Sequence, residues 1–113
     1  MTLDERCNAV EECYEFMLAY AAQGLGTDAE GSPIRDFLRK AVAALTGIAE
    51  VVDAGAFRAV VERDARDSLA AIELVLAQPA ISSQLIDNLN ASIHLRALLT
   101  DLFLLDEISK LRA

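Results

Sequence analysis

Four polar residues fall where the surrounding pattern predicts the interior of a helical protein. Asp64 and Ser68 lie one turn apart inside the apolar arc of one predicted helix, and Ser92 and Arg96 have the same spacing in a later one. An inward-facing arginine is costly unless a carboxylate pairs with it. Folding the later helix back against the earlier one brings Asp64 level with Arg96, so we expect an ion pair between them.

Two roles are open to this cluster. As structure, a buried ion pair fixes the register of two helices without adding much stability, and this is the role we favour. As function, these four side chains and Tyr14 would line a small polar pocket between helices that binds or senses a small molecule. The sequence offers no Ser or Cys nucleophile with a base in reach, so we expect no catalytic residue and no cofactor.

His94 is the only histidine in the chain, and its helical phase places it on the outer face with Asp87 and Asp101. An exposed histidine on an acidic four-helix protein resembles the histidine phosphotransfer domains, which makes phosphotransfer a third candidate function. Those domains usually carry a lysine three residues after the histidine and a glycine four after it, where this chain has Ala97 and Leu98. A phosphoryl group beside two aspartates would also lack a stabilising cation, so a solvated surface histidine is the simpler interpretation.

Carboxylates offer the remaining chemistry. Glu12 and Glu15, followed by Glu50 and Asp53, resemble the ExxE…ExxD pattern with which nucleoside triphosphate pyrophosphohydrolases of the MazG type bind magnesium. The helical phase separates the two halves, since Glu12 and Glu15 point away from the apolar face of their helix and Glu50 lies opposite that of the next. Carboxylates that share a metal must converge, so we expect no metal site.

The apolar pattern that positions these residues predicts four helices. They cover about residues 3–23, 33–53, 56–77 and 82–111. Thr2 and Glu5 form a capping box before the first helix. Pro33 begins the second, and Gly55 and Pro79 end the second and third. Because the connections are short, we predict that residues 1–113 form one domain, an antiparallel up-down-up-down four-helix bundle.

The final predicted helix is apolar around most of its circumference in its second half, which predicts burial on nearly every side. A small domain cannot cover all sides of its own outer helix, so we expect a homodimer, or another protein partner, at this surface. The expected interface residues are Leu95, Leu98, Leu99, Leu102, Leu105 and Ile108. The alternative is a helix that runs through the middle of its own domain.

Composition limits the partners. The net charge of −8 argues against nucleic acid and anionic membranes, because phosphate binding needs clustered Lys and Arg. No apolar run approaches the ~18–20 residues of a membrane span, and the N-terminus lacks a signal peptide pattern, so we expect a cytoplasmic protein. Cys7 and Cys13 are too far apart on one helix for a disulfide, so we expect buried, reduced thiols.

These observations favour a non-enzymatic helical protein that works through protein–protein contact, as an accessory or chaperone-like factor. The motivating features are the apolar second half of the last helix, the acidic exterior and the missing catalytic constellation. A small-molecule sensor and a phosphotransfer protein remain the alternatives.

Overall fold

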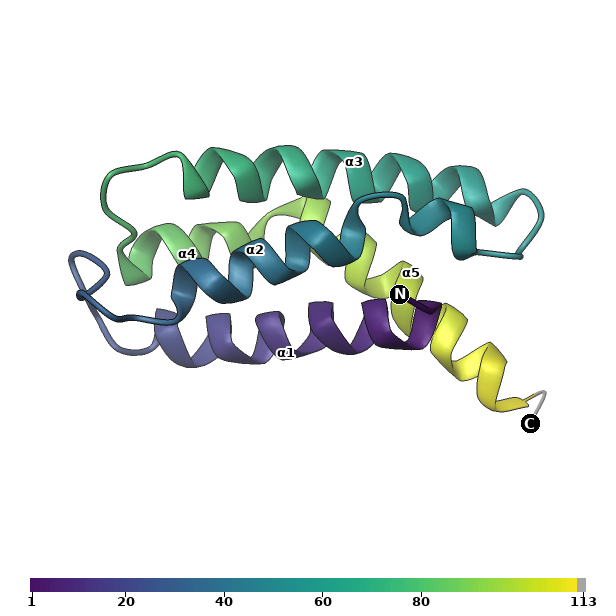
Figure 1. The fold of residues 1–113 in the computed structure, drawn as a ribbon, viewed down its shortest axis with the longest axis horizontal. Helices are drawn as coiled ribbons and strands as arrows, with labels where there is room; N and C mark the ends of the chain where they lie inside the picture. The colour runs from purple at the N-terminus through teal and green to yellow at the C-terminus, as the bar shows by residue number, and fades with distance from the viewer. Residues whose placement is uncertain (112–113) are drawn as a thin grey trace.

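A computed structural model describes residues 1–111, and in this part of the chain all regular secondary structure is helical, with no β-strand (Figure 1). The elements are the α-helices α1 (Leu3–Ala21), α2 (Ile34–Leu45), α3 (Phe57–Leu76), α4 (Ser83–Ala91) and α5 (Ile93–Leu111), and the 3-10 helix η1 (Ile48–Val51). The all-α prediction is confirmed. A strict four-helix bundle is not what the chain forms, because two of the four predicted helices are divided.

The first helix begins as its sequence predicts. The Thr2 hydroxyl oxygen accepts the backbone N–H of Glu5 at 3.2 Å, and the Glu5 carboxylate accepts the backbone N–H of Thr2 at 3.1 Å. This reciprocal arrangement is a capping box, which satisfies two donors that a helix start leaves without partners. α1 and α3 also keep close to their predicted bounds.

The predicted helix over residues 33–53 ends early, at Leu45. Gly47 has a φ of 76°, a left-handed conformation that glycine adopts without strain, and η1 follows it in a new direction. The side chain of Arg6 in α1 donates to the carbonyl oxygens of Ala44 at 2.9 Å and Thr46 at 2.7 Å. A residue from a distant helix therefore satisfies carbonyls that the end of α2 leaves free.

The predicted helix over residues 82–111 is also divided, at Ser92. This residue has an extended backbone (φ −62°, ψ 141°), so it ends α4, and its hydroxyl accepts the backbone N–H of Leu95 at 3.3 Å to cap α5. On the facing helix α3, the buried hydroxyl of Ser68 donates to the carbonyl oxygen of His94 at 3.0 Å. The two serines thus hold the break and fix the first turn of α5 on α3.

Successive helices run in alternating directions, and α4 and α5 together form one bent segment after α3 (Figure 1). α1 packs on α2 and α4, while α3 packs on α2 and α5. The bend turns α5 across the end of the bundle, and the second half of α5 extends beyond the other helices (Figure 1). No helix among residues 1–111 is long and apolar enough to cross a membrane.

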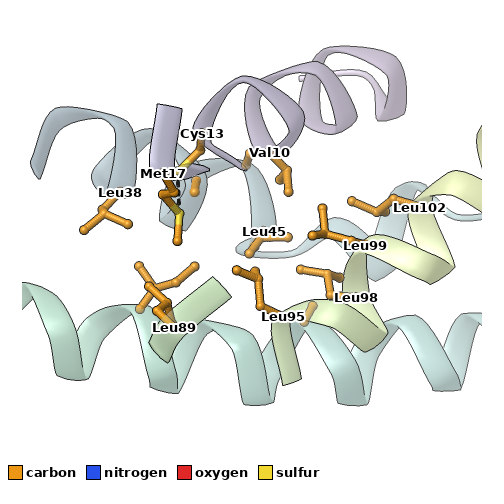
Figure 2. Close-up of a cluster of buried hydrophobic side chains, with 14 of the residues drawn as sticks. Val10, Cys13, Met17, Leu38, Leu45, Leu89, Leu95, Leu98, Leu99 and Leu102 are labelled. Atoms are coloured by element: carbon orange, nitrogen blue, oxygen red, sulfur yellow. Dashed lines mark hydrogen bonds between the residues drawn. The ribbon is translucent and has the colours of Figure 1, made fainter. Parts of the chain in front are cut away.

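This path corrects most of the predicted interface. Four of the six predicted interface residues are at most 4% exposed and belong to the chain's own core, namely Leu95, Leu98, Leu99 and Leu102. They point toward Val10, Met17 and Leu45 of the facing helices (Figure 2). The alternative prediction, a helix that runs through its own domain, therefore describes the first half of α5. Only Leu105 and Ile108 remain outside the buried set.

Both cysteines lie in this core as free thiols, as the sequence predicts. The Sγ atom of Cys13 contacts the sulfur of Met17 at 3.6 Å. Burial raises the pKa of Cys7 to about 11 and that of Cys13 to about 12, so both thiols are protonated at neutral pH.

Candidate functional site

The predicted ion pair between Asp64 and Arg96 does not form within residues 1–111. Arg96 is exposed, and Asp64 faces Asp101 of α5 instead. The bend at Ser92 is the physical reason, because it changes the register that a continuous helix would have against α3. Two carboxyl groups therefore meet at the seam where an acid and a base were expected.

Asp101 is the unusual member of this pair. It was predicted on the outer face beside His94, but it is only 5% exposed, and its Oδ2 atom is buried without a hydrogen-bond partner. Burial, a hydrogen bond with Asp64 and the negative charge of Asp64 raise the pKa of Asp101 to about 7. The pair thus holds a proton at pH values where an ordinary aspartate is ionised.

The other residues of the predicted polar pocket have separate surroundings. Tyr14 is half-buried and lines an apolar cavity of about 10 Å³ with Met17 and Ile72, too small for a ligand. Ser68 and Ser92 are used in the break between α4 and α5. A small-molecule pocket at these positions stays a prediction.

His94 is half-exposed, as predicted, and its Nδ1 atom lies 4.0 Å from a carboxylate oxygen of Asp67 on α3. The described chain places no His, Cys, Asp and Glu side chains in a group of three or more that could hold a metal ion. Among the described residues, His94 therefore has one carboxylate neighbour, Asp67, and the carboxylates do not gather into a metal site.

The strongest candidate site is an apolar groove of about 560 Å³ at the end of the molecule where α5 leaves the bundle. Its lining comes from the start of α1, the segment from η1 to α3 and the second half of α5. The lining residues are Leu3, Val51, Asp53, Ala54, Phe57, Leu104, Leu105, Ile108 and Ser109. We refer to this feature as the α5 groove.

The second half of α5 also carries exposed apolar side chains, two of which, Leu104 and Ile108, line the groove. These exposed side chains are Phe103, Leu104, Ile108 and Leu111, with exposed fractions of 46%, 50%, 44% and 83%. Large apolar side chains gathered in this way mark a contact surface more often than a single exposed leucine does. Nearby on this helix, Asp106 and Glu107 share one cation, since Lys110 Nζ lies 3.2 Å from Asp106 and 3.4 Å from Glu107.

Sequence reasoning found only part of this site. Leu105 and Ile108 were predicted at an interface, whereas Leu3, Val51 and Phe57 were assigned to no site. The groove itself depends on the breaks in the two long helices, so the sequence pattern did not reveal it.

A polar cluster at the opposite end of the bundle serves the fold. Arg35 donates to Asp28 at 2.8 Å and to the carbonyl oxygens of Leu76 at 3.0 Å and Gln78 at 2.9 Å. Asp28 also accepts the backbone N–H of Ile81 at 2.8 Å, and its hydrogen bond with Arg35 holds its pKa well below the usual range. These bonds tie the loop over residues 24–32 to the turn between α3 and α4.

The sequence matches no protein-family model, and the comparisons with curated proteins and with solved structures find no match.

Proposed function

We propose that this protein is a non-enzymatic factor that acts through protein–protein contact, and that it forms a homodimer through the α5 groove. The observation that carries the proposal is the apolar second half of α5, exposed beside an apolar groove of about 560 Å³. In water such a surface gains free energy when a complementary apolar surface covers it.

A second copy of the chain is the occupant that the groove fits best. A groove between helices accepts the apolar side of another helix, and the chain carries such a helix directly beside its own groove. Two copies related by a twofold axis can each place the last turns of α5 in the groove of the other, and both exposed surfaces are then covered at once. Because α5 extends beyond the bundle, this mutual contact between two copies requires no opening of either core (Figure 1).

The charge of the chain makes a distinguishing prediction about this contact. Each copy carries a net charge of −8, so two copies repel one another at long range. Salt screens that repulsion and leaves the apolar contact in place. Dimerisation through the α5 groove should therefore strengthen as salt is added, whereas a contact held by ion pairs would weaken.

The test is the mass of the protein in solution, measured by sedimentation or light scattering. Ile108→Glu places a charge in the groove and should give a monomer. Leu74→Glu is the matched control, because Leu74 is 66% exposed on α3 and lies about 25 Å along the helix from Phe57, at about 1.5 Å per residue. Circular dichroism of both variants shows that the fold is intact.

A dimer in the wild type and in Leu74→Glu, with a monomer in Ile108→Glu, supports the proposal. A wild-type monomer at all accessible concentrations, or an Ile108→Glu variant that dimerises as the wild type does, overturns it. A partner of different sequence at the same groove would appear as a complex that Ile108→Glu loses and Leu74→Glu keeps, with the purified wild type monomeric.

A further inference from the structure

The carboxyl pair of Asp64 and Asp101 lies outside the lining of the α5 groove, within one or two helical turns of residues that line it. Asp101 comes one turn before Leu104 and Leu105, which line the groove from α5. Asp64 comes two turns after Phe57, which lines the groove from α3. The pair therefore joins α3 and α5, two helices that each contribute a wall of the groove, through Phe57 and through Leu104 and Leu105.

No cation neutralises this pair in the part of the chain that the structure describes. The ion pairs of residues 1–111 include neither aspartate. The Oδ2 atom of Asp101 is buried without any hydrogen-bond partner. Two carboxylates brought together away from water cannot both be ionised at low cost, and one shared proton replaces their repulsion with a hydrogen bond.

The helices packed against α5 are α3, α1 and α4, and within residues 1–111 their titratable side chains form no ion pair with Asp64 or Asp101. From α3, Asp64 acts on Asp101 directly, while the neighbouring Asp67 lies near His94. From α1, Cys7 lies near Asp106, and the other charges around that thiol are the acids Asp4 and Glu11. From α4, the one titratable residue is Asp87, which is exposed. The cations nearest in sequence to Asp64 are Arg63 and Arg66 of α3, which are exposed, and Arg66 pairs with Glu62 instead.

We propose that a proton shared by Asp64 and Asp101 holds the two walls of the α5 groove together, so that loss of this proton opens the groove and weakens dimerisation. When both carboxyls are ionised, they repel across the seam of α3 and α5, and the buried Asp101 gains free energy by moving toward water. That movement displaces Leu104 and Leu105, because they follow Asp101 by one turn on the same helix. The inference rests on the proposed function, since it concerns the same groove.

The test measures the dimer dissociation constant by sedimentation between about pH 5.5 and pH 8.5. In the wild type, Kd should rise above neutral pH by about tenfold per pH unit for each proton that dissociation releases. Asp101→Asn should keep a low, nearly constant Kd, because its amide has the shape of the acid and donates a hydrogen bond to Asp64 at every pH. His94→Gln is the control for the nearby histidine and should keep the wild-type pH dependence.

A wild-type dimer whose Kd does not change with pH overturns the inference and leaves the proposed dimer standing. An Asp101→Asn variant with the wild-type pH dependence also overturns it. If the wild type is monomeric, the proposed function fails, and hydrogen exchange in the monomer still tests the carboxyl pair. Amide protection in α5, corrected for the intrinsic rate, should then fall above neutral pH in the wild type and not in Asp101→Asn; equal protection in both chains overturns the inference as well.

Discussion

The substitution Asp101→Asn should make the protein more stable above neutral pH, although it removes a buried residue's native side chain. The pKa of Asp101 is raised from an ordinary 3.8 to about 7 in the folded chain. For an acid whose folded pKa is raised, the contribution to stability is fully present below the unfolded value of 3.8 and is lost as pH rises through the folded value. The wild type therefore loses stability from this group between about pH 4 and pH 7.

The magnitude follows from the size of the shift. The difference between 3.8 and about 7 is about 3 pH units, and each unit corresponds to about 1.36 kcal/mol, which gives an upper value of about 4 kcal/mol. Asp64 is only partly buried, so its carboxylate can turn toward water and relieve some of the repulsion. We therefore expect Asp101→Asn to be more stable than the wild type by about 2–4 kcal/mol at pH 8, and to differ little from it near pH 4.

The assay is urea unfolding followed by circular dichroism, on both chains, at several values between pH 4 and pH 8. The comparison is made at equal pH, so that other titrating groups contribute equally to both chains. In the monomeric Ile108→Glu background the same difference should appear, which separates the carboxyl pair from dimerisation. A constant stability difference across this range, or a variant less stable than the wild type at pH 8, would refute the assignment of a shared proton to this pair.

Three further predictions follow from other parts of the fold. Gly47→Ala should lower the free energy of unfolding by about 1–2 kcal/mol, because it forces a residue with a Cβ into the left-handed conformation. Gly26→Ala is the control in the same urea titration and should change the free energy of unfolding little. Its backbone is not left-handed, and no atom lies within 4 Å of the new Cβ. Asp28→Asn should destabilise the protein at neutral pH and have less effect in strong acid, since the lowered pKa of Asp28 gives stability that is lost as pH falls through it; thermal melting at the two pH values measures this. Cys7 and Cys13, buried with pKa values of about 11 and 12, should react with a thiol reagent at pH 8 only after unfolding by denaturant, and fast labelling of either in the native protein would contradict their placement.

The local parts of the fold were predictable from the sequence because their causes are local. A capping box needs only Thr2 and Glu5, and the end of α3 needs only Pro79 beyond it. The two helix breaks have distant causes. Arg6 caps the carbonyls before Gly47 from about 40 residues away along the chain, and Ser68 bonds to the first turn of α5 from α3. The apolar pattern continues through both breaks, so periodicity alone predicts two long helices.

The candidate site was harder to predict for the same reason. A continuous last helix would place Asp64 level with Arg96, whereas the bend at Ser92 places it against Asp101. The α5 groove combines Leu3 and Phe57 with Ile108, residues from three segments that meet only because the breaks redirect the chain. The apolar excess of the last helix was nevertheless visible in the sequence, and it correctly drew attention to the element that forms one wall of the groove.

The most direct test of the central claim is the sedimentation of three chains at neutral pH: the wild type, Ile108→Glu and Leu74→Glu. Dimerisation through the α5 groove predicts a dimer for the wild type and for Leu74→Glu, and a folded monomer for Ile108→Glu. A folded Ile108→Glu dimer with the wild-type dissociation constant would contradict the claim, as would a wild type that stays monomeric up to the highest soluble concentration.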